Sequence, residues 1–149
     1  MSVFFDTNVL VCAVDRALPA KRAVATDLLD RHVRAHSLVV STQVLQEFYA
    51  VAVGRGLLEP ADALEMAGAL AQEAVVPSSG EFVVRALALA QRHLLSGWDG
   101  LIVQAAIDAR CSILLSEDLA PGTRFGQLEI VNPFAPGDHD AAPQRRRRR

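Results

Sequence analysis

Four acidic side chains of this sequence stand where an apolar segment ends or a helical pattern begins. Asp6 directly follows the apolar run Val3 to Phe5, and Asp118 follows a second apolar run late in the chain. Glu47 and Asp99 lie near the starts of two segments whose apolar residues recur with a helical period. If these four segments meet in the fold, four carboxylates share one cleft.

Each acid taken alone has an ordinary structural explanation. Asp99 fits a helix-capping pattern with Ser96, and Glu47 lies beside Phe48 at the edge of an apolar stripe with its head in water. Asp118 belongs to the polar turn Ser116 to Asp118. The four acids taken together need a further explanation, because clustered carboxylates repel one another and resist ionisation without a counter-charge.

A divalent cation would supply that counter-charge. Ligands that are all oxygen atoms suit Mg²⁺ or Mn²⁺ and not zinc. One such ion, or two held roughly 3.5–4 Å apart, can activate water and stabilise charge on a phosphoryl centre. The sequence holds no Walker loop and no Gly-x-Gly-x-x-Gly, so nucleotide binding of those kinds has no support. His32 and His36 are four residues apart, but no acidic motif accompanies them, and we expect a surface-facing pair.

Short apolar runs alternate with longer helical patterns, which predicts βαβ units and a parallel sheet covered on both faces. In such sheets ligands bind beyond the carboxyl ends of the strands, where Asp6 and Asp118 fall. We expect strands at 3–5, 37–41, 74–77, 111–116 and 128–134, and helices at 19–36, 42–53, 60–73, 80–95 and 98–109.

Length and composition are typical of one soluble globular domain. The chain has 149 residues, of which 51% are hydrophobic and 21% are charged. No apolar run is long enough to span a membrane, and the N-terminus lacks the features of a signal peptide. Cys12 and Cys111 lie in apolar segments, which favours two buried free thiols and a reducing, cytoplasmic setting.

The charge is unevenly distributed. Five of the 15 basic residues are Arg145 to Arg149, so the rest of the chain sets ten basic residues against 17 acidic ones. We expect an ordered domain at 1–134 and a disordered, arginine-rich tail at 135–149. That tail could hold RNA or another anionic partner, or it could be a solvated terminus, and the sequence leaves both readings open.

Four segments in order resemble the successive motifs of PIN domains: FFDTNVLV, STQVLQEFY, SGWDGLIVQAA and LLSEDLAPGTRFGQLEIVNPF. The likeness is strongest to the VapC-type toxin ribonucleases of bacterial toxin–antitoxin pairs, and it covers roughly Ser2 to Phe134. The resemblance implies a three-layer α/β/α domain with a central, mostly parallel sheet. It also implies cleavage of RNA that depends on Mg²⁺ or Mn²⁺.

The resemblance assigns roles to eight residues by motif. The acids that would bind metal and carry catalysis are Asp6, Glu47, Asp99 and Asp118. The polar groups that would orient these acids or position the substrate are Thr7, Asn8 and Ser116, with Glu117 nearby. Similar proteins form homodimers and are inhibited by a cognate antitoxin that inserts a segment into the active-site groove. Gly100 departs from the family pattern, in which alanine is usual, and we expect it to weaken the helix start slightly.

An acidic protein that cleaves RNA needs basic side chains along the approach. The candidates are Arg16, Lys21, Arg22, Arg55 and Arg124.

Two other functions compete with the ribonuclease. A non-catalytic module that binds RNA or protein would keep the fold, but the intact set of acids argues against it. A phosphatase of the haloacid dehalogenase kind begins with Asp-x-Asp, whereas Asn8 stands two residues after Asp6 here.

Overall fold

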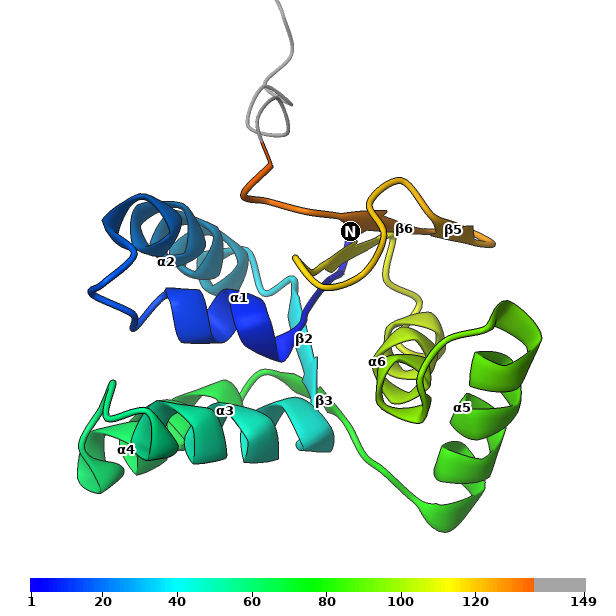
Figure 1. Cartoon of the computed structure of the whole chain (residues 1–149), viewed down its shortest axis with the longest axis horizontal. Coiled ribbons are helices and arrows are strands. Elements are labelled where there is room, and N and C mark those ends of the chain that lie inside the picture. Colours follow the sequence, from blue (N-terminus) through cyan, green and yellow to red (C-terminus); the bar gives the residue numbers. More distant parts are fainter. Residues whose placement is uncertain (136–149) are drawn as a thin grey trace, which may run out of the picture.

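The computed structural model describes residues 1–135, so the tail expected at 135–149 lies outside the described residues except for Ala135. Residues 1–135 form a six-stranded sheet in the order β3-β2-β1-β4-β6-β5 (Figure 1). The strands are β1 (Val3–Phe5), β2 (Leu38–Ser41), β3 (Ala74–Val76), β4 (Ile113–Leu115), β5 (Arg124–Phe125) and β6 (Leu128–Val131). Every neighbouring pair is parallel except β5 and β6, which are antiparallel.

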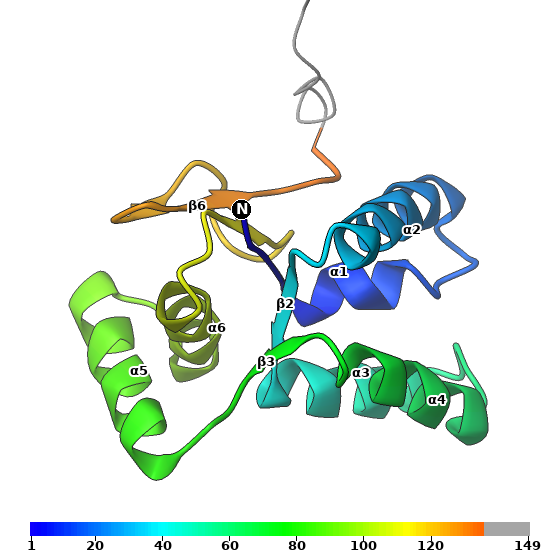
Figure 2. The same ribbon diagram turned by 180° about the vertical axis from the view of Figure 1, so that it is seen from behind.

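Helices cover both faces of this sheet. They are α1 (Thr7–Cys12), α2 (Pro19–Arg34), α3 (Thr42–Gly54), α4 (Pro60–Leu70), α5 (Gly80–His93) and α6 (Gly97–Asp108). Helices α1 to α4 lie on one side of the sheet, and α5 and α6 lie on the other (Figures 1 and 2). The expected three-layer α/β/α architecture with a mostly parallel sheet is confirmed.

Side chains at the helix starts explain where several helices begin. The hydroxyl oxygens of Ser41, Ser79 and Ser96 each accept a hydrogen bond from a backbone N–H of the first turn, in α3, α5 and α6 respectively. Pro19 and Pro60 occupy the first turns of α2 and α4, where the missing N–H costs nothing. These local signals are the ones that made the longer helices predictable.

Two elements of the fold were not predicted. Helix α1 has only six residues and five of them are buried, so its apolar pattern shows no helical period. Strand β5 has two residues and, within residues 1–135, pairs only with β6. The prediction that His32 and His36 both face the surface was wrong for His32. His36 is exposed, whereas His32 is half-buried, with its ring 5.6 Å from that of Phe5 and its Nδ1 2.7 Å from the Ser37 hydroxyl.

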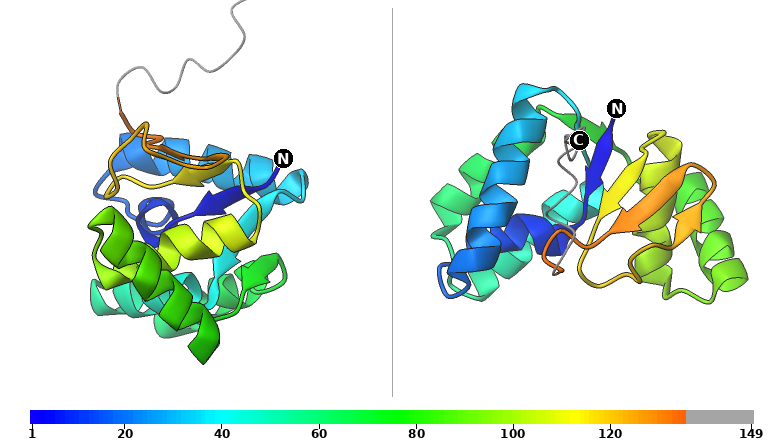
Figure 3. Two further views of the ribbon diagram at one scale, coloured as in Figure 1. Left: turned by 90° about the vertical axis from the view of Figure 1, so that its right-hand side faces the viewer. Right: turned by 90° about the horizontal axis from the view of Figure 1, so that it is seen from above.

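The central strand β1 decides where the site can be. Phe4 and Phe5 are fully buried between the two helical layers, and β1 runs between β2 and β4 in the same direction as both (Figure 3). The carboxyl ends of these strands therefore meet at one edge of the sheet, with Asp6 directly after β1. Both cysteines are buried and free, and within residues 1–135 no helix is long and apolar enough to cross a membrane.

Candidate active site

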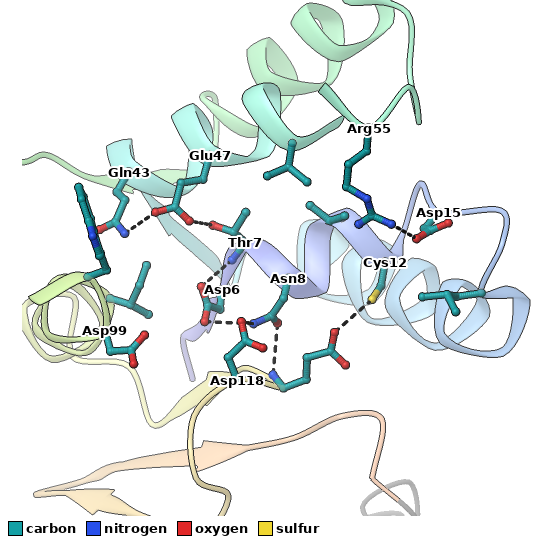
Figure 4. A pocket seen from close by; sticks show the side chains of 16 residues that line it. Asp6, Thr7, Asn8, Cys12, Asp15, Gln43, Glu47, Arg55, Asp99 and Asp118 are labelled. Carbon is teal, nitrogen blue, oxygen red and sulfur yellow. Dashed lines mark hydrogen bonds and ion pairs between the residues drawn. The ribbon is translucent and has the colours of Figure 1, made fainter. Parts of the chain in front are cut away.

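The four acids singled out by the sequence line a single cleft of about 300 Å³ at the carboxyl edge of the sheet. Asp6 reaches it from the end of β1, Glu47 from α3, Asp99 from the first turn of α6, and Asp118 from the loop after β4 (Figure 4). The parallel topology brings these four side chains together, although the first and the last of them, Asp6 and Asp118, are more than 100 residues apart in the chain.

Asp6 is the most deeply placed of the four acids, with 7% of its surface exposed. It caps α1, because its Oδ1 accepts the backbone N–H of Thr7 at 2.7 Å. Its Oδ2 accepts the hydroxyl of Ser116 at 2.8 Å and the side-chain amide of Asn8 at 3.3 Å. One carboxylate therefore both starts a helix and joins it to the end of β4.

The pKa of Asp6 is raised to about 6, chiefly because burial disfavours the charged form. Hydrogen bonds from Ser116 and from the N–H of Thr7 lower this pKa, but they do not outweigh burial. The negative charges of Asp118 and Glu47 raise it further. The cleft therefore holds a carboxyl group that ionises reluctantly, first because it is buried and then because two other acids lie near it.

Asn8 and Ser116 connect Asp6 to the loop that carries Asp118. The Nδ2 of Asn8 lies 3.0 Å from an oxygen of Asp118 and 3.3 Å from the Ser116 hydroxyl. Its Oδ1 accepts the backbone N–H of Glu117 at 3.2 Å. The fully buried Ser116 oxygen in turn accepts the backbone N–H of Asp118 at 3.2 Å. Asn8 and Ser116 therefore both contact Asp6 and the loop of Asp118, and their role in orienting the acids stays a prediction.

Glu47 is held at both carboxylate oxygens. The hydroxyl of Thr7 donates to Oε2 at 3.0 Å, and the amide of Gln43 donates to Oε1 at 2.6 Å. Thr7 thus contacts two of the acids, Asp6 through its backbone and Glu47 through its side chain. Gln43 was not predicted to belong to the site, although it stands four residues before Glu47 on the same helix, which is the spacing of facing side chains.

Asp99 differs from the other acids because its carboxylate makes no hydrogen bond within the described part of the chain. Its backbone N–H donates to the hydroxyl of Ser96 at 3.1 Å, so the serine caps α6 and the carboxylate is left for the cleft. Asp99 is half-buried, and Figure 4 shows it on α6, across the cleft from Gln43 and Glu47.

Glu117 lines the cleft, but its carboxylate pairs with a cation. Its Oε2 lies 2.6 Å from the Nζ of Lys21, and its Oε1 lies 3.9 Å from the Sγ of Cys12. At the same end of the cleft, Arg55 donates to the buried Asp15 at 2.9 Å. Within residues 1–135, Arg55 is the only one of the five basic candidates that lines the cleft. Arg124 instead pairs with Glu129 at the edge of the sheet.

The donor set of this cleft suits a divalent cation. Among the residues that the structure describes, six acidic residues and one basic residue line it, and its acids offer only oxygen ligands, which are those that Mg²⁺ and Mn²⁺ prefer. In residues 1–135, however, no three His, Cys, Asp or Glu side chains are arranged to hold a metal ion. The chemistry of the acids fits an ion, and they would have to draw together around it.

Residues 3–120 match the family described as "PIN domain". The chain belongs to the PIN domain family. Three solved structures share the fold: a toxin–antitoxin complex from Klebsiella pneumoniae (20% identity, TM-score 0.63, 89% of this chain and 98% of that chain), VapBC2 from Rickettsia felis bound to a promoter DNA fragment (16%, 0.60, 87% and 97%), and VapC20 of Mycobacterium tuberculosis, a sarcin-ricin loop cleaving toxin (18%, 0.59, 76% and 87%). A search of curated proteins gave no match.

Gly100 has a packing role in this PIN domain that the sequence did not reveal. A Cβ at this position would lie 2.6 Å from the Cβ of Ala90 and 2.7 Å from the carbonyl oxygen of Ala86, both on α5. Gly100 therefore permits the close approach of α5 to α6, next to Asp99. We expected this glycine only to weaken the helix start, whereas it also lets the two helices pack.

Proposed function

We propose that this PIN domain is the toxin ribonuclease of a VapC-type toxin–antitoxin pair and that it hydrolyses RNA phosphodiester bonds with Mg²⁺ or Mn²⁺. The observation that carries the proposal is the convergence of Asp6, Glu47, Asp99 and Asp118 on one cleft. The shared fold with VapC20, whose own description names cleavage of an RNA loop, supports the same class of reaction.

In this proposal the four acids hold the ion, which when bound would activate water and stabilise charge on the phosphoryl oxygens. Thr7 and Gln43 keep both oxygens of Glu47 in place, and they do so from two different helices. Asp99 has no hydrogen-bond partner for its carboxylate within residues 1–135. One of its oxygens is therefore available to accept the proton that the attacking water loses.

Ser116 and Asn8 do the corresponding work for the other two acids. The Ser116 hydroxyl fixes the direction of Asp6, and the Asn8 amide spans the gap between Asp6 and Asp118. Their hydrogen bonds keep two like-charged groups near each other before any cation is present. That pre-organisation is what polar neighbours of metal ligands usually supply.

The proposed partners follow from the same likeness. The Klebsiella pneumoniae structure is a toxin–antitoxin complex, and the Rickettsia felis structure is VapBC2. We therefore infer a cognate antitoxin for this chain. We also propose a homodimer, and the exposed apolar side chains of Val84 and Leu87 on α5 are consistent with a covered face. A toxin that acts on cellular RNA would work in the cytoplasm.

The test is cleavage of RNA by purified protein without its partner. Single-stranded and structured RNAs are incubated with Mg²⁺, with Mn²⁺ or with a chelator, using the wild type, Asp6→Asn and Asp99→Asn. Asp62→Asn is the matched control, because Asp62 is an exposed acid in the first turn of α4 and does not line the cleft. We expect cleavage by the wild type and by Asp62→Asn only, and only with metal.

Two results would overturn the proposal in different ways. Cleavage that persists in Asp99→Asn and in the chelator would show that the acids and the ion are not the catalytic groups. No cleavage of any RNA, together with no binding of Mn²⁺, would leave the alternative of a non-catalytic PIN-like module that binds RNA or protein.

A further inference from the structure

We propose that the indole of Trp98 stacks on an unpaired base of the RNA substrate and holds it beside the four acids. This inference rests on the proposed ribonuclease function and adds to it the side chain that positions the base. Trp98 immediately precedes Asp99 and lines the same cleft as the four acids. A base held against it lies beside the carboxylates.

The exposure of Trp98 is the first observation. Its side chain is 70% exposed, although tryptophan is the largest apolar side chain and usually dominates a core or an interface. The core of this domain is built without it, from phenylalanine and aliphatic side chains. An exposed indole at the mouth of a polar cleft offers a flat apolar surface that the fold itself does not use.

The position of Trp98 is fixed although its ring is exposed. It is the second residue of α6, whose start is capped by the hydroxyl of Ser96. Two residues later, Gly100 packs against the backbone of α5. The helix end that carries the indole is therefore held from both sides, so the backbone of Trp98 is already ordered before a base stacks on the ring.

The charge of the cleft is the second observation. Six acids and one base line it, and the one base, Arg55, already donates to the buried Asp15. Lys21, at the edge of the cleft, pairs with Glu117. Most proteins hold nucleic acid chiefly through cations on phosphates, and the cleft residues described here leave few cations for that. Stacking supplies affinity that does not depend on basic side chains.

The cleft also has an apolar wall next to the indole. Ile102 stands one helical turn after Trp98 on α6 and also lines the cleft. A cleft of about 300 Å³ is at the lower end of the range for small-ligand pockets, which is the size of a site for a single nucleotide. Bases inside a duplex are already stacked on both faces, so an unpaired base gains more here.

The first arm of the test uses the fact that Trp98 is the only tryptophan of the chain. The Asp6→Asn protein is titrated with a short single-stranded RNA of mixed sequence and with the same sequence as a duplex. We expect saturable quenching of Trp98 fluorescence by the single strand, and much weaker quenching by the duplex. Binding of labelled RNA, followed by anisotropy, with unchanged Trp98 emission would overturn the proposal.

The second arm separates stacking from general apolar contact. Trp98→Phe keeps an aromatic ring, whereas Trp98→Leu keeps apolar bulk without a flat face. We expect Trp98→Leu to weaken RNA binding roughly 5- to 150-fold, and Trp98→Phe to lose much less. Leu94→Ala is the matched control, since Leu94 is 93% exposed at the end of α5 and does not line the cleft. It should bind RNA like the wild type.

A third arm names the partner group. In a series of RNAs with one abasic nucleotide at successive positions, one position should weaken RNA binding by the wild type as much as Trp98→Leu does. The same abasic position should not weaken RNA binding by the Trp98→Leu protein any further.

Equal cleavage by the wild type and Trp98→Leu would overturn the stacking proposal while the ribonuclease function stands. No cleavage or binding by the wild type would overturn both. A changed oligomeric state in Trp98→Leu, with RNA binding intact, would assign the indole to a protein contact instead.

Discussion

Replacing Asp6 by asparagine should stabilise the folded protein in the same step that removes its proposed activity. Asp6 is buried beside two other acids, and its pKa is about 6 instead of the ordinary 3.8. The folded protein therefore keeps the Asp6 proton at a pH where the unfolded chain has lost it. Stability that depends on this group falls as the pH rises from about 4 to about 6, and the loss persists above that range.

The size of the effect follows from the same two pKa values. Their separation corresponds to about 3 kcal/mol of lost stability once Asp6 is fully ionised in the folded state. Asparagine carries no charge at any pH and escapes this cost. Between about pH 4 and about pH 8, the free energy of unfolding of Asp6→Asn should therefore rise relative to the wild type by about 2.5 kcal/mol. Interactions that do not depend on pH cancel in this double difference.

The assay is urea unfolding followed by circular dichroism, at both pH values, with a chelator present. Asp62→Asn, on the exposed first turn of α4, is the control and should change the free energy of unfolding by no more than about 0.5 kcal/mol. In separate samples at the higher pH, Mg²⁺ replaces the chelator, and it should stabilise the wild type and not Asp6→Asn. A double difference near zero, or of opposite sign, would refute the claim that burial among acids destabilises the charged form of Asp6.

Three further predictions concern packing and hydrogen bonding around the site. Gly100→Ala should lower the free energy of unfolding by about 1–3 kcal/mol through overpacking. Gly68→Ala is the control, because an added Cβ there meets nothing within 4 Å, and it should raise the free energy of unfolding by about 0.4–1 kcal/mol. Thermal unfolding compares the two variants, and equal effects would contradict the packing role of Gly100. Asn8→Ala should slow RNA cleavage about 10- to 100-fold with the fold retained, and an unchanged rate would show that its amide does not organise the acids. Arg55→Ala should cost about 1–3 kcal/mol in urea unfolding, because it strips a hydrogen bond from the buried carboxylate of Asp15; no loss would mean that the pair contributes little.

The convergence of the four acids was predictable because it depends on topology and little else. Asp6 follows an apolar strand directly, and parallel strands share one edge at their carboxyl ends. The cap at Ser96 likewise follows from a local pattern, and the structure shows that this serine and not Asp99 serves the helix start. Features set by chain order and by neighbours along the chain were therefore accessible from the sequence.

The features that the sequence did not reveal depend on contacts between distant segments. Helix α1 is buried on nearly every side, which erases the periodicity that marks a helix. The side chain of Glu117 points to Lys21 because the two residues, 96 positions apart in the chain, form an ion pair in the fold. The requirement for glycine at position 100 comes from α5, a separate helix, and no property of its own segment indicates it.

The central claim is that clustered acids and a divalent ion direct water onto an RNA phosphate, and the ends of the RNA products test it most directly. Attack by water that breaks the bond from phosphorus to the 3′-oxygen leaves a 5′-phosphate and a 3′-hydroxyl, whereas attack by the neighbouring 2′-hydroxyl expels the 5′-oxygen and leaves a 2′,3′-cyclic phosphate and a 5′-hydroxyl. Mass spectrometry of the fragments should show hydrolytic ends from the wild type with Mg²⁺ or Mn²⁺, and no fragments from Asp99→Asn or in the presence of a chelator. Cyclic phosphate ends that form equally well with the chelator would contradict the account.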